Sequence, residues 1–385
     1  MTITDLAASL ARASKQGTRV AVEGSGTKRG WGSLAQPVDL VLSTTPLNAL
    51  VEHRSGDLTA TVPAGAPLAA VNRELARQGQ WIPLDPPWAE SGTIGGVVAT
   101  NDSGPRRHRF GAPRDLIIGV EIVRIDGTIA KSGGIVVKNV AGYDLGRLMT
   151  GSFGCLAVIA SVTFKLYPIP PASRTVAIDV GDDAGVTALA EGVLAALAAS
   201  QLTPTSVELE ALPFRLLVRF ESIESAAEQQ AETAARLAQA AGARTAIVAG
   251  GPERALWDAH AQRPWAGTGA VVKVTCLPAQ VGPTIAWLSQ ALGDVEWEVV
   301  GRAAVGALLL RLAGDGKRQA QTIADLRGRF SPGAGSAVIV RGSDELKRLA
   351  DVWGPGGDSL PMMRAVKRQF DPDGLLNPGR GPFGL

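Results

Sequence analysis

Glycine-rich turns hold most of the residues in this chain that could contact a ligand, and residues 84–111 are the most informative of these turns. In this segment, Gly92, Gly95, Gly96 and Gly104 remove side chains from a stretch that is also rich in Thr, Ser and Asn. Glycine lets the backbone come close to a ligand, while hydroxyls and bared N–H groups supply hydrogen-bond donors. Glycine weakens a strand interior, so a core strand would gain nothing from this composition. The segment predicts a surface that lies against a flat or anionic ligand.

A second turn follows a predicted strand near the N-terminus, where residues 20–28 read VAVEGSGTK. Successive N–H groups of the Gly-Ser-Gly-Thr turn can form a nest for phosphate oxygens. The alternative is a tight connection between strands. The turn is neither a Rossmann fingerprint nor a P-loop, because it lacks the third glycine of the first and the lysine position of the second.

A third glycine-rich element spans residues 138–158, where Gly151 and Gly154 bring the backbone past a narrow point. The alternative here is a plain helix-to-strand connection. Lys138 and Arg147 in the same element favour an anion nearby, since both side chains donate charge-assisted hydrogen bonds.

No set of residues for nucleophilic, acid–base or metal chemistry stands out in the sequence. Cys155 and Cys276 are far apart, and His53, His108 and His260 occur singly, without HExxH or CxxC spacing. The two cysteines exclude a disulfide framework and favour a reducing cytoplasm. Three glycine-rich turns without a catalytic set indicate that a bound cofactor brings the chemistry, and no metal site is predicted.

Composition places the chain among ordinary globular proteins. Its 385 residues have room for two or three domains, with 45% hydrophobic and 19% charged residues. The net charge is +2, from 38 basic and 36 acidic residues, which gives no support for a nucleic-acid partner. The most apolar helical stretch, 186–199, is too short to span a bilayer. The N-terminus predicts an amphipathic helix and lacks the basic start and apolar core of a signal peptide, so a cytoplasmic location is expected.

Short strands separated by turns fill the first 170 residues, and the proline cluster at 167–171 predicts a linker. A helix is expected at 68–75, ended by Gly79. The expected strands lie at 19–22, 40–42, 58–62, 116–124, 128–130 and 158–166.

Beyond the linker, alanine-rich helices alternate with strands in an order that occurs twice. Each half predicts the βαββαβ order of a ferredoxin-like unit, and two such units could join edge to edge into one antiparallel sheet. The first unit has expected strands at 174–180, 205–211, 214–220 and 244–249, with helices at 185–199 and 224–242. The second has strands at 269–276, 295–300, 303–312 and 336–341, with helices at 279–292 and 316–329.

The tail is different again. A helix is expected at 361–370, with Met362, Val366 and Phe370 on one side. The turn-forming run DPDGLLNPGR at 371–380 would normally be only a surface loop.

Taken in order, these motifs resemble the FAD-binding family of vanillyl-alcohol oxidase and p-cresol methylhydroxylase (PCMH). The resemblance depends on GSGT at 24–27, TVPAGA at 61–66, TIGG at 93–96, SG at 103–104, GSFGCL at 151–156 and NPG at 377–379. The runs at 92–105, 109–115 and 137–154 are most similar to the smaller FAD-binding subunits of bacterial glycolate oxidases. The similarity covers residues 18–170 and the tail, and the middle of the chain only by its pattern of elements.

The resemblance implies an α+β fold: a two-subdomain FAD-binding domain of PCMH type at 1–170, a ferredoxin-like cap domain with an antiparallel sheet at 171–345, and a C-terminal segment at 346–385 that returns to the FAD domain. It also implies which residues bind FAD. Gly24, Ser25, Gly26 and Thr27 would hold the pyrophosphate. The path of pyrophosphate and flavin would be lined by Thr93, Gly95, Gly96, Ala99, Thr100, Ser103 and Gly104. The adenosine end would pack on Gly154, Val158 and Ile159, and Asn377 would return to the flavin region.

Departures from the family pattern refine these expectations. Members with covalent flavin use a His or Cys in or near the first loop, whereas residues 23–29 read EGSGTKR, so noncovalent FAD is expected. Cys155 and Ala157 replace the usual Thr and Gly of the third element. Related 2-hydroxy-acid dehydrogenases carry a metal-binding HxGDGNxH segment, and this sequence has none.

The leading interpretation is therefore a flavoprotein subunit of a cytoplasmic glycolate (2-hydroxy acid) oxidase complex, with no transmembrane segment of its own and a peripheral inner-membrane position only through its partners. A larger flavin-binding subunit would oxidise the small 2-hydroxy acid, and an iron–sulfur subunit would be the second partner, because this chain has too few cysteines to hold a cluster. One alternative is a self-sufficient flavin oxidase, with substrate held by Lys138, Arg109 or Tyr143. The other is a scaffold that keeps the fold and binds FAD only structurally. The sequence assigns no catalytic residue.

Overall fold

The computed structural model describes residues 1–135, 142–181, 186–331 and 333–385. The chain forms two compact units. The first comprises Met1–Gly104, Phe110–Ile169 and Pro355–Leu385, and the second comprises Pro105–Arg109 and Pro170–Gly354. Thus a short segment, 105–109, is assigned to the second unit although both of its neighbours belong to the first, which the sequence did not suggest. The later boundary at 354/355 also differs from the expected 345/346.

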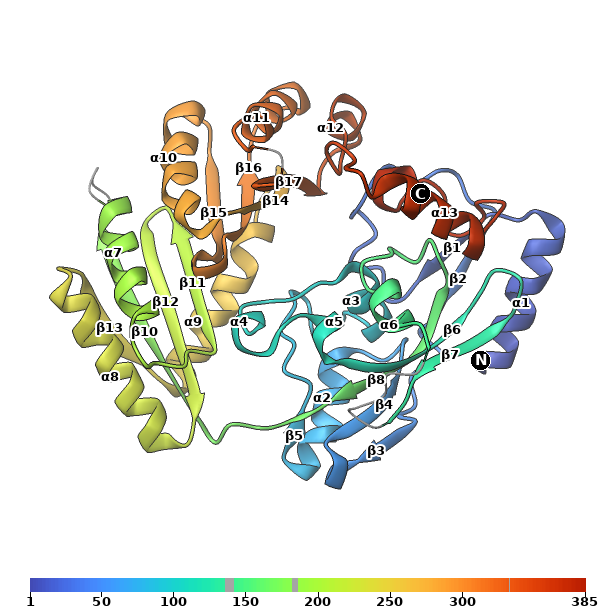
Figure 1. Ribbon diagram of the computed structural model, residues 1–385, viewed down its shortest axis with the longest axis horizontal. Helices are drawn as coiled ribbons and strands as arrows, with labels where there is room; N and C mark the ends of the chain where they lie inside the picture. Colours follow the sequence, from blue (N-terminus) through green and yellow to red (C-terminus); the bar gives the residue numbers. More distant parts are fainter. Residues whose placement is uncertain (136–141, 182–185, 332) are drawn as a thin grey trace. The chain divides into compact units, whose positions relative to one another are not determined.

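The first unit begins with the expected amphipathic helix, α1 (Ile3–Gln16). Thr2 and Asp5 form a capping box at its start, and Gly17 ends it in the left-handed conformation. Strand β1 (Val20–Glu23) pairs in parallel with β2 (Leu40–Ser43) on one side. On its other side the C-terminal tail adds a parallel bridge between Val20 and Leu376 (Figure 1). Strands expected from the sequence at 19–22 and 40–42 are therefore present, and the tail is part of their sheet region.

The first unit also contains a five-stranded antiparallel sheet, in the order β3-β4-β8-β6-β7. Strand β8 lies at its centre and is buried over almost its whole length. The strands are β3 (Glu52–Arg54), β4 (Thr59–Pro63), β6 (Ile117–Val123), β7 (Ile129–Gly133) and β8 (Val158–Lys165).

The remaining elements of this unit are short. Its main core lies between β4, β6 and β8 and the helices α2 and α3. The elements are α2 (Leu68–Leu75), α3 (Ile94–Thr100), α5 (Pro113–Leu116), α6 (Leu145–Met149) and α13 (Leu360–Phe370), the 3-10 turns η1 (Ser55–Asp57), η2 (Ala76–Gln78) and η6 (Pro382–Gly384), and the paired strands β5 (Gln80–Trp81) and β9 (Tyr167–Pro168). Helix α4 (Arg107–Phe110) contains the boundary in the sequence between Arg109, of the second unit, and Phe110, of the first.

The second unit contains an eight-stranded sheet in the order β13-β10-β12-β11-β15-β16-β14-β17, and every pair in it is antiparallel. The first four strands in this order and the last four are the two expected βαββαβ units, joined edge to edge through β11 and β15 (Figure 1). The strands are β10 (Ala172–Gly181), β11 (Ser206–Ala211), β12 (Phe214–Ser222), β13 (Arg244–Val248), β14 (Ala270–Cys276), β15 (Trp297–Arg302), β16 (Ala307–Leu312) and β17 (Gly335–Arg341).

Helices cover the two faces of this sheet unequally. Alternate residues of β11, Val207, Leu209 and Ala211, belong to the core with the long helices, whereas Glu208 and Glu210 point to the other face. The helices on the core face are α7 (Val186–Ala198), α8 (Glu224–Ala240), α10 (Val281–Leu292) and α11 (Gly316–Gly328), and α12 (Asp344–Leu349) follows β17.

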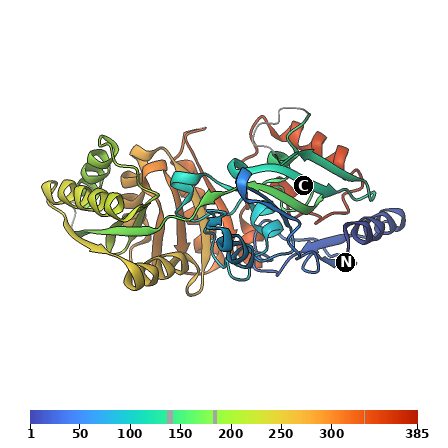
Figure 2. The same cartoon turned by 90° about the horizontal axis from the view of Figure 1, so that it is seen from below.

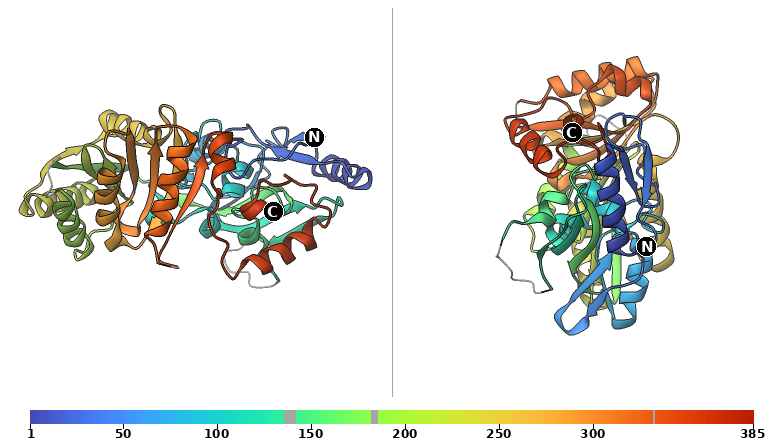
Figure 3. Two further views of the ribbon diagram at one scale, coloured as in Figure 1. Left: turned by 90° about the horizontal axis from the view of Figure 1, so that it is seen from above. Right: turned by 90° about the vertical axis from the view of Figure 1, so that its right-hand side faces the viewer.

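Helix α9 (Gly250–Gln262) is an addition that the repeat pattern did not predict. It is followed by the 3-10 turn η3 (Arg263–Trp265), and two similar turns, η4 (Pro278–Gln280) and η5 (Ala303–Val305), lie in the second repeat. Figure 2, and Figure 3 from the other side, show α9 in gold across the sheet from α7 and α8 in green and yellow. Consequently the face that carries Glu208 and Glu210 is partly covered by α9.

Candidate functional site

A small pocket in the first unit is lined by residues from all three glycine-rich segments and from the C-terminal tail. Its cavity volume is about 70 Å³. The residues that line it are Val22, Glu23, Gly24, Ser25, Gly26, Thr27, Lys28, Arg29, Thr93, Gly96, Ala99, Thr100, Phe153 and Arg380. Among them are Gly24 to Thr27, Thr93, Gly96, Ala99 and Thr100, which the sequence analysis assigned to FAD.

The first turn leaves β1 at Glu23 and passes directly against the start of α3. A Cβ atom at Gly24 would lie 2.1 Å from Thr93 Oγ1, so only glycine fits there without displacing Thr93. Gly26 has a φ of 76°, in the left-handed region that favours glycine. Glycine is therefore required at Gly24 by the close contact with Thr93 and favoured at Gly26 by the backbone conformation.

Residues 94–100 form a helix rather than an open loop, which the glycine content did not suggest. Thr93 caps α3 and accepts a hydrogen bond from Gly96 N at 3.3 Å, and Asn101 ends the helix in the left-handed conformation. The two glycines have different surroundings. A Cβ at Gly95 would lie 3.0 Å from the Cβ of Ala64, whereas Gly96 lines the pocket.

Lys28 and Asp102 form an ion pair beside the pocket, with 3.2 Å between Lys28 Nζ and Asp102 Oδ2. The two side chains are only 6% and 9% exposed. Neither Lys28 Nζ nor Asp102 Oδ2 has a hydrogen-bond partner in the described part of the chain. No role for Lys28 was predicted from the sequence, although it directly follows the Gly-Ser-Gly-Thr turn.

The other two cations in the pocket wall are already engaged. Arg29 binds Glu23 through two hydrogen bonds of 3.0 and 2.5 Å, and Glu23 raises the pKa of its guanidinium. Arg380 donates to the carbonyl oxygens of Lys28, Arg29 and Trp31, and its burial lowers the pKa of the guanidinium.

Asn377 ties the tail to both sides of the pocket. Its Oδ1 accepts a hydrogen bond of 2.9 Å from Val22 N, and its Nδ2 donates one of 3.0 Å to Phe153 O. Phe153 N donates in turn to Ala99 O at 2.8 Å. A Cβ at Gly154 would lie 2.5 Å from Asn377 Nδ2, so Gly154 makes room for this side chain. Asn377 therefore positions backbone around the pocket, and the pocket lining does not include it.

The other residues predicted to bind FAD are not among the residues that line the pocket. Val158 and Ile159 are buried in β8, on opposite faces of the sheet. Gly104 is buried against the carbonyl of Asp85, which a Cβ there would approach to 1.9 Å, and Ser103 precedes it. Their assignment to FAD remains a prediction.

Of the three residues considered as substrate ligands, two lie in the described part of the chain, one in each unit. Lys138 lies outside the described residues. Tyr143 is 90% exposed in the first unit, and Arg109 is exposed and belongs to the second.

The pocket fits a cofactor that carries phosphate groups. Its first wall is a turn of small residues whose backbone can approach a ligand closely, and its second is the glycine-containing face of α3. Lys28 is also among the lining residues, and its buried ammonium group has no hydrogen-bond partner within the described residues. Burying a charge is costly unless it is paired and hydrogen-bonded, so this group favours an anion at the pocket.

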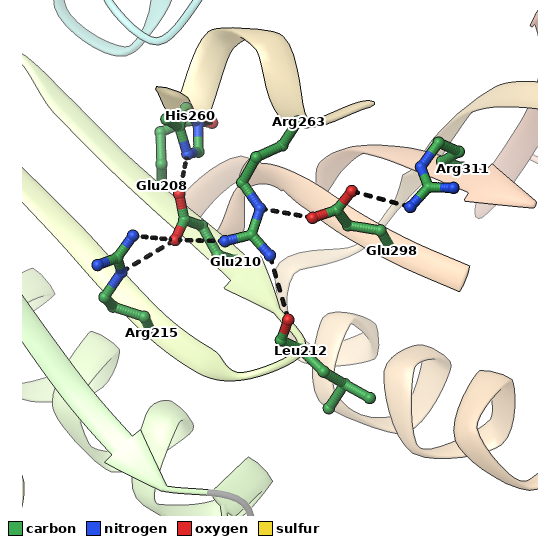
Figure 4. A network of polar contacts seen from close by, with 8 residues as sticks. All are labelled: Glu208, Glu210, Leu212, Arg215, His260, Arg263, Glu298 and Arg311. Atoms are coloured by element: carbon green, nitrogen blue, oxygen red, sulfur yellow. Dashed lines mark hydrogen bonds and ion pairs between the residues drawn. The ribbon is translucent and has the colours of Figure 1, made fainter. Parts of the chain in front are cut away.

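The second unit holds a charged network on the face of the sheet that α9 covers (Figure 4). His260 lies between Glu210 and Glu208, at 2.7 and 3.2 Å from its two ring nitrogens. Glu210 also binds Arg215 and Arg263, and Arg263 continues to Glu298. Within the described residues, no group of three or more His, Cys, Asp or Glu side chains could hold a metal ion.

A bidentate pair links segment 105–109 to the rest of this unit. Arg106 Nε and Nη2 donate to the carboxylate of Glu221 at 3.0 and 2.7 Å. Burial alone would raise the pKa of Glu221, but the hydrogen bonds and charge of Arg106 outweigh it and lower that pKa.

The His260 network predicts a specific dependence of stability on pH. Burial alone would lower the pKa of His260, but its bonds to Glu208 and Glu210 raise it. Burial alone would raise the pKa of Glu210, but His260 and Arg215 lower it to about 2. The His260 contribution is thus complete below the unfolded pKa, about 6.5, and is lost as pH rises through the higher folded pKa. The Glu210 contribution is complete above about 4.5 and is lost as pH falls towards 2.

We therefore expect the difference in unfolding free energy between wild type and His260→Gln to be largest between about pH 4.5 and 6.5. Urea unfolding of the second unit at several pH values measures it. A difference that stays constant to pH 9 would show that His260 is not charged in the folded protein.

Comparison with known proteins shows that two segments of the chain match family models. Residues 1–133 match a family model described as an FAD binding domain. Residues 190–380 match a second model, described as the C-terminal domain of FAD linked oxidases.

Curated relatives show similarity at modest identity. The chain is 36% identical over 187 residues to glycolate oxidase subunit GlcE of Escherichia coli (strain K12), covering 48% of this chain and 53% of that protein. It therefore spans about half the length of GlcE. It is 27% identical to glycolate oxidase subunit GlcD of Bacillus subtilis (strain 168), covering 93% and 82%. It is 28% identical to a D-2-hydroxyglutarate dehydrogenase of Xanthomonas citri pv. viticola, covering 96% and 85%.

Solved structures share the fold. An alkyldihydroxyacetonephosphate synthase matches 96% of this chain and 73% of its own, with a TM-score of 0.72 and 16% identity. A chitooligosaccharide oxidase matches 99% and 90%, with a TM-score of 0.69 and 14% identity. The α+β fold class expected from the sequence is confirmed.

Proposed function

Because this chain belongs to the FAD-linked oxidoreductases of the PCMH type, with FAD as cofactor, we propose that it is the FAD-binding subunit of a glycolate (2-hydroxy acid) oxidase complex. When bound, FAD would accept two electrons from a substrate, which is thereby oxidised. The chain's own residues would hold the cofactor and exclude water around it. The observation that carries the proposal is the pocket formed by Gly24 to Thr27 and α3, in a chain similar to GlcE and GlcD.

The partners proposed are a larger flavin-binding subunit and an iron–sulfur subunit. The names of GlcE and GlcD, both called glycolate oxidase subunits, support a complex. The sequence lacks the metal-binding HxGDGNxH segment, which favours oxidation of the hydroxy acid on the larger subunit. None of the described helices has both the length and the apolar character needed to cross a bilayer.

One experiment separates this proposal from its alternatives. The chain is purified alone, its flavin absorbance is recorded, and glycolate is added without oxygen, with and without the two partner subunits. Because the larger partner is itself expected to bind flavin, the partner subunits alone are the control. Bleaching in the mixture that exceeds theirs, with none in the chain alone, supports the subunit. Bleaching by glycolate with the chain alone supports a self-sufficient oxidase. FAD that is bound but never reduced, even in the reconstituted complex, supports the scaffold.

The FAD is expected to be noncovalent. The first loop, residues 23–29, contains no His or Cys that could bond to the flavin. Precipitating the protein with acid should therefore release all of the flavin into the supernatant, where its absorbance at 450 nm is measured. Yellow colour that stays with the precipitated polypeptide would contradict the expectation.

A further inference from the structure

Lys28 is a cation whose interactions are incomplete. Its side chain is 94% buried, and its ammonium group has Asp102 Oδ2 at 3.2 Å and the ring centroid of Trp31 at 5.5 Å. No hydrogen bond reaches the ammonium within the described residues, so its three donors are not satisfied. A buried ammonium with one poorly aligned counter-ion carries a large cost of desolvation.

The position of Lys28 connects this cost to the pocket. Lys28 directly follows the Gly-Ser-Gly-Thr turn and lines the same pocket. Gly92 lies beside the ammonium: a Cβ there would lie 3.7 Å from Lys28 Nζ and 3.0 Å from the carbonyl oxygen of Trp88. Arg29 is bound to Glu23, and Arg380 to backbone carbonyls. Among the cations of the described lining residues, Lys28 is thus the one whose buried charged group makes no hydrogen bond.

From these contacts we infer that the Lys28 ammonium, which has Asp102 as its counter-ion, donates charge-assisted hydrogen bonds to the diphosphate of bound FAD. The inference rests on the proposed function, since it takes FAD as the ligand of this pocket. To the proposed function it adds one residue, Lys28, and the positive charge of its ammonium group. Asp102 keeps the apoprotein neutral at this point, and the diphosphate supplies the oxygen acceptors that the ammonium lacks.

The test compares the affinities of apoprotein for FAD, ADP and riboflavin, measured by calorimetry. ADP shares the diphosphate with FAD, and riboflavin shares only the ring system. Lys28→Met should weaken FAD and ADP by the same factor, about 10- to 100-fold, as expected for loss of a charge-assisted hydrogen bond. It should leave riboflavin affinity unchanged, and Lys28→Arg should recover most of the loss. Lys15→Met, at an exposed lysine of α1, is the matched control and should change nothing.

Because Lys28→Met leaves Asp102 buried without a partner, the fold needs its own control. The double variant Lys28→Met/Asp102→Asn removes both charges, and its circular dichroism and melting temperature should be close to wild type. Its affinity for FAD should still be low. Recovery of wild-type affinity in the double variant would show that the single variant had only misfolded, and would overturn the inference.

The remaining outcomes are distinct. If wild type binds FAD and a folded Lys28→Met variant binds it equally well, the inference is wrong and the proposed function is unaffected. Weaker FAD binding with unchanged ADP binding places the ammonium at the flavin ring and overturns the diphosphate assignment. Wild type that binds no FAD overturns the proposed function and, with it, the inference.

Discussion

Gly96→Trp is expected to abolish FAD uptake by a protein that still folds. Gly96 lines the pocket from α3, and a Cβ there would meet Thr93 Oγ1 alone, at 3.3 Å. A larger side chain can therefore extend from the wall into the space that a cofactor needs. We expect the affinity for FAD to fall by about 100-fold or more, equivalent to at least about 2.7 kcal/mol. Flavin content per polypeptide and titration of apoprotein with FAD measure the effect.

The control for this variant is Gly56→Trp. Gly56 is exposed in η1, and a Cβ there would have no atom within 4 Å. Both variants should keep the circular dichroism spectrum of wild type, and Gly56→Trp should also keep its FAD. Because replacing glycine inside a helix removes its cost of about 1 kcal/mol, α3 itself should not be weakened. Full FAD content in a folded Gly96→Trp variant would show that the cofactor binds outside this pocket.

Asp371→Ala is expected to cost the first unit about 3–5 kcal/mol of unfolding free energy, because it leaves the Lys367 ammonium buried without a counter-ion. Asp371 is 1% exposed, and Lys367 Nζ lies 2.5 Å from its Oδ2. The same ammonium donates to the carbonyl of Cys155, while the carboxylate accepts from the backbone N–H groups of Leu375 and Leu376. This pair therefore fixes the tail to the third glycine-rich element.

Urea unfolding of the first unit measures this loss. The control is Asp373→Ala, which removes an exposed carboxylate in the same turn and should change the free energy by less than about 0.5 kcal/mol. The double variant Lys367→Met/Asp371→Leu should lose less than Asp371→Ala, since it leaves no lone charge. A loss below about 1 kcal/mol in Asp371→Ala would show that the pair does not hold the tail.

A looser tail should also weaken the cofactor site. Asn377 follows Leu376 and bridges Val22 N and Phe153 O on two sides of the pocket. Asp371→Ala is accordingly expected to lower FAD affinity even at urea concentrations where the unit remains folded. The tail thus acts on the site through backbone geometry and without lining it.

The pattern of elements was predictable because it depends on local periodicity. The two βαββαβ units follow from alternation in the strands and from the alanine-rich helices, and every expected strand of the eight-stranded sheet is present. Helix α9 could not be found in this way, because it interrupts the repeat and packs polar residues such as Glu253 and His260 against the sheet. Helix α3 was not predicted because glycine is unfavourable inside a helix, although Thr93 caps this one.

Sequence alone determined the family-level features of this protein: its α+β class, the order of its glycine-rich turns and the expectation of FAD. These depend on residues close together in the chain, where glycine and hydroxyl side chains have effects of their own. Only the tertiary structure decided which glycines face a pocket and which face the core, as Gly96 and Gly95 show. It also brought Lys28 beside Asp102, and Asn377 beside Val22 and Phe153. Such pairs join residues far apart in sequence, and their burial, which gives the charges and hydrogen bonds their weight, exists only in the folded chain.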